Sequence, residues 1–285
     1  MAEPRPGAVL ITGCSSGMGR AAALRLHRGG WPVYATARKV ETLAELAGLG
    51  IQTRELDLVD EQSMTAVVAE ITARHGAVGV LVNNAGYGLA GTVEETPMEA
   101  VRAQFEANLI GPALLSKLVL PGMRAQGRGR IVNVSSFFGR FGTAGRGYYQ
   151  AAKHGLEALS DALRHEAASH GVQVVVVQPG PAFTAFVDSS RDTLGLQRAA
   201  GHYAEFWKRF DEWHEVYRHP ENPRGRARFA VTPEEVAKTI EHVLTVRRPA
   251  PRYQVGLLPR LLLLLHRTLP GRAFDTFTRA VFPTP

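Results

Sequence analysis

Close to its N-terminus the chain reads Ala8-Val9-Leu10-Ile11-Thr12-Gly13-Cys14-Ser15-Ser16-Gly17-Met18-Gly19, and a helical pattern begins at Arg20. The first five residues are mostly apolar and rich in β-branched side chains, which predicts a buried strand. The glycines allow a sharp turn, and the free N–H groups and positive end of the following helix attract an anion. The stretch therefore predicts a strand, a phosphate cradle and a helix. An ordinary strand-to-helix turn remains the alternative, because the spacing is G-x-x-x-G-x-G and not G-x-G-x-x-G.

Strand and helix patterns alternate along the rest of the chain, which predicts parallel strands with helices on both faces. The 285 residues, 45% of them apolar, suffice for a sizeable core. We therefore expect one α/β domain over residues 1–285, with a doubly wound Rossmann-type parallel sheet of seven strands. Strands are expected near residues 9–12, 33–36, 52–55, 80–83, 131–134, 172–177 and 253–255, and helices near 19–28, 41–47, 61–75, 97–107, 113–125, 149–169 and 233–245. Residues 181–228 are expected to form a substrate lid and residues 256–285 an apolar and basic C-terminal extension.

Two of the expected helices begin with a capping signal. It reads Thr96-Pro97-Met98-Glu99 in one case and Thr232-Pro233-Glu234-Glu235 in the other. In each, a threonine at the cap is followed by a proline at the first helical position and an acidic residue at the third. Both are predicted to form capping boxes.

The composition of the chain indicates which class of ligand and which cellular compartment to expect. The formal net charge of +7 suits anionic ligands such as phosphates, although net charge also simply aids solubility. No helix-turn-helix or zinc pattern indicates a nucleic-acid partner. The single cysteine, Cys14, cannot form an internal disulfide, and residues 1–7 are polar and Pro-rich rather than an apolar leader. A cytoplasmic location is therefore expected. Cys14 itself is either a small residue that fits the turn or a reactive thiol.

A second stretch, Tyr149-Gln150-Ala151-Ala152-Lys153, carries a pair of side chains suited to proton transfer. Four residues along a helix bring the phenol and the ammonium to one face. A positive charge nearby favours the phenolate, so Lys153 is expected to lower the pKa of Tyr149 toward a working pH. Tyr148 has Ala152 at the matching position, so the spacing selects Tyr149. Taken alone, the pair is a weak signal and is more typical of a solvated helix face, because Tyr and Lys fall four residues apart by chance in many helices.

Five motifs follow one another in a recognisable order. They are Thr12-Gly13-x-x-x-Gly17-x-Gly19, Asn83-Asn84-Ala85-Gly86, Ser136, Tyr149-x-x-x-Lys153 and Pro179-Gly180. In this order and at these separations they resemble the short-chain dehydrogenase/reductase family, over residues 8–255. The opening Thr-Gly-Cys-Ser-Ser-Gly, the Ala-Thr-x-Arg loop and the long lid resemble the hydroxysteroid and retinol dehydrogenase branch.

The resemblance implies hydride transfer between a nicotinamide and a carbonyl or alcohol carbon. The loop after the second strand contains Arg38 and no carboxylate, so NADP(H), with its 2′-phosphate, is expected in preference to NAD(H). Arg38 as an ordinary exposed base remains the alternative. Asp57 is expected either to accept from the adenine amine, as the resemblance implies, or to cap the following turn. The residues expected to bind the cofactor are Gly13, Ser15, Ser16, Gly17, Met18, Arg38, Asp57, Leu58, Asn84, Ala85, Gly86, Tyr149, Lys153, Pro179, Gly180 and Thr184.

The turn Asn83-Asn84-Ala85-Gly86 ends an apolar run, at the sheet edge where ligands collect in open α/β folds. The resemblance implies that this turn stabilises the central sheet and lies against the adenosine ribose. A turn chosen for its left-handed backbone is the alternative.

The resemblance assigns catalysis to Asn108, Ser136, Tyr149 and Lys153. Tyr149 acts as general acid in reduction and as general base in oxidation, and Ser136, thirteen residues earlier, donates to the substrate oxygen. Lys153 also binds the nicotinamide ribose. Asn108 either holds a water that links Lys153 to solvent or is an ordinary Asn at a helix end. No metal is needed, and His165 and His170, five residues apart, are interpreted as surface histidines.

Aromatic residues predict a bulky apolar substrate. A stripe at helical spacing within the lid either packs on the core or walls the substrate pocket. Its members are Tyr203, Phe206, Trp207, Phe210, Trp213 and Tyr217. The residues expected to bind substrate are Ser136, Phe138, Tyr149, Phe183 and Phe186.

Residues 256–285 contain an apolar run, Leu261 to Leu265, that is too short to span a bilayer. Arginines alternate with apolar residues there, so contact with a membrane surface, packing over the active site and packing against another subunit all remain open. The resemblance also implies a homo-oligomer that forms through the helices near Ala113 and Tyr149.

The leading hypothesis is an NADP(H)-dependent oxidoreductase for a bulky apolar carbonyl or secondary alcohol that is steroid-, retinoid- or lipid-like. One rival is a reductase of 3-oxoacyl thioesters or small carbonyls on the same scaffold. Another, from a different class, is a non-catalytic NADP(H)-binding regulator. The complete set of four catalytic residues argues against the regulator.

Overall fold

The computed structural model describes residues 7–182, 201–215, 217 and 225–285. Seven parallel strands form one sheet in the order β3-β2-β1-β4-β5-β6-β7, as predicted for a Rossmann-type fold. The strand order reverses between β1 and β4, and ligands bind beside the carboxyl ends of the strands at such a point. The strands are β1 (Ala8–Thr12), β2 (Val33–Ala37), β3 (Gln52–Glu55), β4 (Val78–Asn83), β5 (Gly129–Val134), β6 (Val172–Pro179) and β7 (Arg252–Val255).

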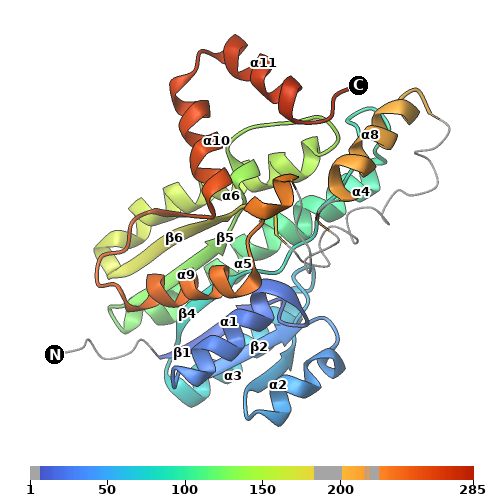
Figure 1. The fold of residues 1–285 in the computed structure, drawn as a ribbon. Coiled ribbons are helices and arrows are strands. Elements are labelled where there is room, and N and C mark those ends of the chain that lie inside the picture. Colours follow the sequence, from blue (N-terminus) through green and yellow to red (C-terminus); the bar gives the residue numbers. More distant parts are fainter. Residues whose placement is uncertain (1–6, 183–200, 216, 218–224) are drawn as a thin grey trace.

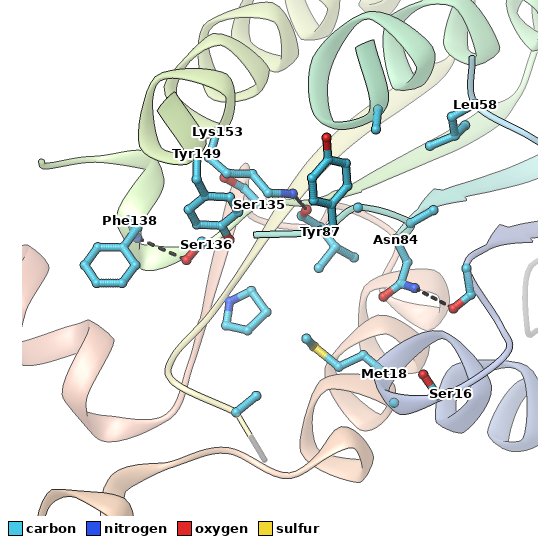
Figure 2. Close-up of a pocket in the computed structure, with 18 of the residues that line it drawn as sticks. Ser16, Met18, Leu58, Asn84, Tyr87, Ser135, Ser136, Phe138, Tyr149 and Lys153 are labelled. Atoms are coloured by element: carbon cyan, nitrogen blue, oxygen red, sulfur yellow. Dashed lines mark hydrogen bonds between the residues drawn. The ribbon is translucent and has the colours of Figure 1, made fainter. Parts of the chain in front are cut away.

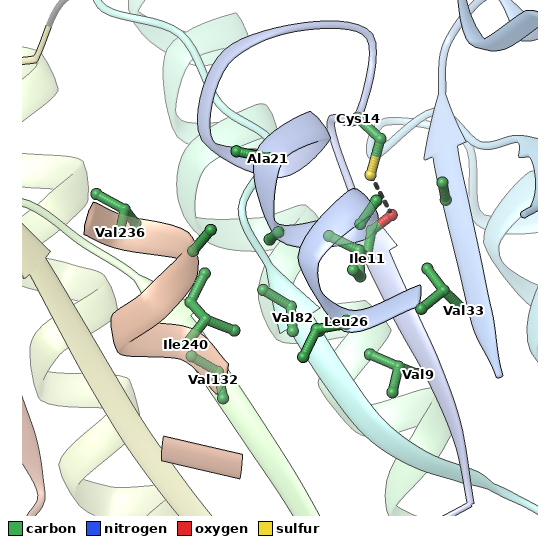
Figure 3. Close-up of a cluster of buried hydrophobic side chains, with 14 of the residues drawn as sticks. Val9, Ile11, Cys14, Ala21, Leu26, Val33, Val82, Val132, Val236 and Ile240 are labelled. Carbon is green, nitrogen blue, oxygen red and sulfur yellow. Dashed lines mark hydrogen bonds between the residues drawn. The ribbon is translucent and has the colours of Figure 1, made fainter. Parts of the chain in front are cut away.

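Helices cover both faces of the sheet (Figure 1). One face carries α1 (Gly17–Arg28), α2 (Ala44–Gly48) and α9 (Pro233–Thr245); the other carries α3 (Glu61–His75), α5 (Gly111–Ala125) and α6 (Gly147–Ala167). Successive strand residues point to opposite faces, so Val9 packs with α1 and α9 while Leu10 packs with α3 and α5. Figure 3 shows the first of these cores, where Leu26 and Ile240 meet the strands.

Shorter elements complete the described chain. They are η1 (Val40–Leu43), α4 (Met98–Phe105), η2 (Glu106–Ile110), η3 (Phe137–Gly139), η4 (Ala168–His170), α8 (Ala204–Glu215), η6 (Gly225–Phe229), α10 (Leu257–Thr268) and α11 (Gly271–Val281). None of the described helices combines the length and apolar character needed to cross a bilayer.

The two helices expected at 97–107 and 113–125 are in fact continuous. The π-helical segment η2 joins α4 to α5, and the Gly111 N–H donates to the Glu106 carbonyl five residues back. The sequence pattern suggested a break because Asn108 and Gly111 are poor helix formers. A π-helical turn absorbs them without ending the helix, and such turns are frequent at functional sites.

One of the two predicted capping boxes is present. The Thr232 hydroxyl accepts from the Glu235 N–H, and the Glu235 carboxylate accepts from the Thr232 N–H. The prediction at Thr96 is wrong, because Pro97 occupies the cap position and the Thr96 hydroxyl donates to the Thr92 carbonyl at 2.5 Å. The Thr96 side chain stabilises the turn before the helix instead.

The C-terminal helices α10 and α11 stand beyond the three layers, above one end of α6 (Figure 1). Their inner side chains Leu262, Phe274 and Phe282 pack in one cluster with Phe138 and Tyr149. Of the alternatives left open for residues 256–285, packing over the site region is therefore observed.

Candidate active site

A cavity of about 670 Å³ lies at the carboxyl ends of the central strands. Nearly every residue expected to bind the cofactor lines it, and so do Ser136 and Phe138. Asn108 is not among the lining residues. Phe183, Thr184 and Phe186 lie outside the described residues. The predicted residues that line the cavity are Gly13, Ser15, Ser16, Gly17, Met18, Arg38, Asp57, Leu58, Asn84, Ala85, Gly86, Ser136, Phe138, Tyr149, Lys153, Pro179 and Gly180.

The glycine turn is packed too closely to admit side chains. Gly13 has a φ of 73°, and a Cβ on it would lie 2.8 Å from the Ala85 Cα. A Cβ on Gly19 would lie 2.3 Å from the Gly13 carbonyl oxygen. Helix α1 begins at Gly17, so its free N–H groups lie at this cavity wall. Bare backbone beside a helix N-terminus fits a pyrophosphate, which is more than an ordinary strand-to-helix turn requires.

The turn after β4 is tied directly to β1. The Thr12 hydroxyl oxygen accepts from the Asn84 and Ala85 N–H groups at 3.1 and 3.0 Å, and Asn84 Nδ2 donates to the Thr12 carbonyl at 2.9 Å. The expected stabilisation of the sheet is confirmed. The left-handed alternative is wrong, because no residue from Asn83 to Gly86 has a positive φ.

Arg38, expected to favour NADP(H), and Asp57, expected to contact the adenine or to cap a turn, both line the cavity. Arg38 is exposed. Burial raises the pKa of Tyr87, and the charge of Arg38 opposes that rise. Asp57 Oδ1 accepts from the Val59 N–H at 3.2 Å. The turn-capping interpretation of Asp57 is therefore confirmed, and the same side chain also faces the cavity. Tyr87 was missed by sequence reasoning because it belongs to no motif.

Ser136, Tyr149 and Lys153 gather at the end of the cavity away from Ser16 and Met18 (Figure 2). The hydroxyls of Ser136 and Tyr149 are hydrogen-bonded to each other, and Ser136 Oγ also accepts from the Phe138 N–H at 3.2 Å. The backbone thus fixes Ser136 with its hydroxyl beside the phenol. The choice of Ser136 over Ser135 agrees with this geometry, since Ser135 Oγ is buried without a hydrogen-bond partner among the described residues.

The structure shows what surrounds Tyr149 and Lys153, and the expected effect of Lys153 on the pKa of Tyr149 stays a prediction. Burial raises the pKa of Tyr149, and the groups that oppose burial are Ser136, through its hydrogen bond, and Arg146, through its charge. The Lys153 ammonium donates to the Val134 carbonyl at 2.9 Å, and burial lowers its pKa to about 8. Four-residue spacing brings Lys153 to the same face as Tyr149, but it does not decide what the ammonium binds.

Asn108 is fully buried inside η2. Its Oδ1 accepts from the Tyr87 N–H at 3.1 Å, and its Nδ2 donates to the Tyr87 carbonyl at 2.8 Å. The helix-end interpretation is wrong, because the helix continues through Asn108. Its amide holds the loop that carries Tyr87, and a relay through water stays a prediction.

Some residues of the aromatic stripe pack in a core cluster and others line the cavity, so each of the two interpretations holds for part of the stripe. Phe206, Trp207 and Phe210 of α8 form a buried cluster of their own, as the core interpretation predicts. Trp213 and Tyr217 line the cavity, as the pocket-wall interpretation predicts. Phe206, Trp207 and Phe210 therefore anchor α8, whereas Trp213, near the end of α8, and Tyr217, beyond that end, reach the site.

The structure also shows the surroundings of Cys14, of the two histidines His165 and His170, and of two cavity residues that were not predicted. Cys14 is completely buried, and burial raises the pKa of its thiol to about 12, which indicates a packing residue and not a reactive thiol. His165 and His170 are exposed, as expected of surface histidines. Arg146 and His214 line the cavity but were not predicted, because neither stands in a recognised motif.

Known proteins resemble the chain along most of its length. A family model described as short chain dehydrogenase matches residues 7–195. The uncharacterized oxidoreductase YbbO of Escherichia coli (strain K12) is 35% identical over 268 residues, which cover 94% of this chain and 92% of that protein. Retinol dehydrogenase 5 of Mus musculus is 35% identical over 295 residues, which cover 97% of this chain and 89% of that protein. The solved structure of an actinorhodin polyketide ketoreductase variant with NADPH is 31% identical with a TM-score of 0.72, and the match covers 90% of this chain and 97% of that one.

The chain therefore belongs to the short-chain dehydrogenase/reductase family, whose members are oxidoreductases that bind a nicotinamide cofactor. Within that family it lies near the retinol dehydrogenase-like branch.

Proposed function

We propose that this oxidoreductase transfers a hydride between NADP(H) and a bulky apolar carbonyl compound or secondary alcohol. The observation that carries the proposal is the position of Tyr149. Its hydroxyl is hydrogen-bonded to Ser136, and its ring packs in a cluster with Phe138 and the inner faces of α10 and α11. A proton donor that opens onto aromatic walls suits a large apolar molecule with one oxygen to protonate.

Different residues of the cavity wall would bind the cofactor and the substrate. The turn from Gly13 to Gly17 would hold the pyrophosphate, Arg38 the 2′-phosphate and Asp57 the adenine amine. The bound cofactor supplies or accepts the hydride. In reduction, Tyr149 gives its proton to the carbonyl oxygen, and Ser136 donates a hydrogen bond to the same oxygen as negative charge develops.

The preference for NADP(H) rests on the chemistry of the β2 loop. Arg38 is an exposed guanidinium at the cavity wall, and its neighbours Ala37, at the end of β2, and Lys39 offer no carboxylate for a ribose diol. The polyketide ketoreductase with NADPH is a relative whose cofactor agrees with this preference.

The test is loss of NADPH absorbance with retinal, steroid ketones, long-chain aldehydes and an acetoacetyl thioester, with NADH run in parallel. Selective turnover of the bulky compounds with NADPH supports the proposal. Selective turnover of the thioester supports the rival reductase, which the likeness to a polyketide ketoreductase favours. Tight NADPH binding with no turnover of any compound supports the non-catalytic regulator.

We also propose that α10 contacts an anionic membrane surface. Leu257, Leu261 and Leu264 are 54%, 49% and 57% exposed and share one helix face, and Arg260 and Arg267 lie along its edge. Co-sedimentation with phosphatidylglycerol vesicles, but not with phosphatidylcholine vesicles, is expected, and Leu261→Glu should abolish it. Unchanged sedimentation of that variant, or a dimer that covers these three leucines, would contradict the proposal.

A further inference from the structure

Glu157 of α6 is a buried carboxylate one helical turn after Lys153, and it is not among the residues that line the cavity. It is 3% exposed. Its Oε2 accepts from Arg252 Nε at 2.9 Å, and its Oε1 accepts from Gln178 Nε2 at 2.8 Å. A buried ion pair adds little net stability compared with apolar residues of the same volume, so stability alone does not explain this one.

The first partner, Gln178, belongs to β6, and the residues that follow it form part of the cavity wall. The Gly180 N–H donates to the Val255 carbonyl at 3.1 Å, and a Cβ on Gly180 would lie 2.8 Å from Pro259 Cγ of α10. The wall at Gly180 is therefore held from one side by Glu157, through Gln178, and from the other side by β7 and α10.

The second partner, Arg252, is the first residue of β7, the strand that leads directly to α10. Its Nη2 donates to Asp161 Oδ2 at 2.6 Å, so one guanidinium binds two carboxylates that are one turn apart on α6. Glu157 also contacts η3, because a Cβ on Gly139 would lie 3.1 Å from Glu157 Cγ. The same short helix carries Phe138, which lines the cavity. Glu157 thus lies where β6, β7 and η3 meet.

The sheet order shows which part of the cavity this wall belongs to. Strand β6 adjoins β5, which leads to Ser136, and two strands separate it from β1, which leads to the glycine turn. In the proposed function the nicotinamide lies near Tyr149, the proton donor, and the adenosine half lies beside the glycine turn and Arg38. The wall at Gly180 is therefore on the nicotinamide side.

We propose that Glu157 is a positioning residue for the nicotinamide half of the cofactor, and that it fixes the cavity wall at Gly180 through Gln178 and the start of β7 through Arg252. The proposal rests on the proposed function, which assigns hydride transfer to this end of the cavity. Because Glu157 does not line the cavity, it acts only through these partners. Its loss should weaken binding of the nicotinamide half and leave binding of the adenosine half unchanged.

Isothermal titration calorimetry of NADPH and of 2′,5′-ADP, which contains only the adenosine half, separates the two effects. Glu157→Gln keeps the length of the side chain, but its amide turns an N–H group toward one of the two donors. The affinity for NADPH should fall about tenfold, as expected when a hydrogen bond to a charged group is lost, and the affinity for 2′,5′-ADP should stay unchanged. Circular dichroism confirms that each variant is folded.

Gln178→Met tests the same link from its other partner, and it keeps the proposal testable if Glu157→Gln does not fold. It leaves the ion pair between Glu157 and Arg252 intact. Gln178 Oε1 has no hydrogen-bond partner among the described residues, so the side-chain bond that is lost is the one to Glu157. The affinity for NADPH should fall severalfold, again without a change for 2′,5′-ADP.

Glu70→Gln is the matched control. Glu70 of α3 pairs with Arg54 of β3, and neither residue lines the cavity, so the substitution removes the same charge from another ion pair between a helix and a strand. Both affinities should stay unchanged. A selective loss of NADPH affinity in this control would overturn the proposal, because any broken ion pair would then have that effect.

The outcome does not depend on turnover. Unchanged NADPH affinity in Glu157→Gln and Gln178→Met, or an equal loss for NADPH and 2′,5′-ADP, overturns the proposal even if the enzyme reduces ketones. A selective loss of NADPH affinity in these two variants, in a protein that turns over none of the substrates, would support the positioning role and count against the proposed activity.

Discussion

The cofactor end of the cavity is formed mainly by main-chain atoms, and the substrate end mainly by side chains. At the cofactor end, main-chain atoms approach so closely that Gly13 and Gly19 have no room for a Cβ, and Thr12 ties the turns after β1 and β4 together. At the substrate end, aromatic side chains of η3 and α8 line the cavity, and side chains of α10 and α11 pack in one cluster with Phe138 and Tyr149. These elements lie far apart in the sequence. The cofactor end should therefore tolerate little change of any kind, whereas the substrate end should tolerate changes that keep its volume.

Tyr149 lies at the substrate end of the cavity, and the largest effect is expected there. Tyr149→Phe keeps the ring in its cluster and removes the hydroxyl that is bonded to Ser136. Turnover should fall by about 10³-fold, the range of a lost general acid, while NADPH affinity stays nearly constant. Initial rates and NADPH fluorescence titration measure the two quantities. A variant that retains turnover would remove Tyr149 from the chemistry.

Gly19→Ala tests the main-chain construction of the cofactor end. The added Cβ would meet the Gly13 carbonyl oxygen at 2.3 Å and Asn84 Nδ2 at 2.5 Å, so the turn has to move. The free energy of unfolding should fall by about 2–3 kcal/mol, and NADPH affinity should fall with it.

Gly48→Ala in α2 is the control for that substitution, because a Cβ there meets nothing within 4 Å. It should raise the free energy of unfolding by about 0.5 kcal/mol, since alanine is the better helix former. Urea unfolding measures both variants. Equal stabilities for the two would mean that the turn is not closely packed.

Arg38→Glu addresses selectivity at the cofactor end. A carboxylate at this position repels a 2′-phosphate and accepts from a ribose diol, so the ratio of NADPH to NADH efficiency should fall by about thirtyfold. The kcat/KM for each cofactor measures it, and Lys39→Glu, one residue further along the loop, shows how much of the change is general charge. An unchanged ratio would make Arg38 an ordinary exposed base.

The difference between the two ends also explains what the sequence could predict. The glycine turn, the Asn83–Gly86 turn and the Tyr149 to Lys153 spacing are local patterns, and the structure places all three at the cavity. The partners of Lys153 and Asn108 were not predictable from spacing, because they depend on which main-chain carbonyl lies near each buried side chain. The same limit applies to Arg146 and His214, which meet only because α8 packs over the start of α6.

The buried Lys153 makes stability depend on pH. Its pKa is about 8 in the folded chain and 10.5 as the reference value, so the unfolded chain binds more protons between these values. Stability should therefore rise with pH in this window, relative to Lys153→Met, by about 1.5 kcal/mol from pH 8 to pH 9.5. Urea unfolding of both proteins at each pH measures the difference. Parallel curves would show that Lys153 is not desolvated in the absence of cofactor.

The smallest effect is expected at the substrate end, from Trp213→Phe. This side chain lines the cavity, and its Nε1 donates to the Val281 carbonyl of α11 at 3.0 Å. Phenylalanine keeps an aromatic wall but loses that bond, so the KM for a bulky substrate should rise severalfold, about 1 kcal/mol, with NADPH affinity unchanged. Phe206→Leu, in the α8 cluster away from the cavity, should lower stability without changing the ratio of KM values for bulky and small substrates. If Phe206→Leu changed that ratio as much as Trp213→Phe did, the position of α8 as a whole would determine the KM for a bulky substrate. The contact between the Trp213 side chain and the substrate would then not be the cause. The substrate end would then resemble the cofactor end, where small displacements of the backbone matter more than the identity of any one side chain.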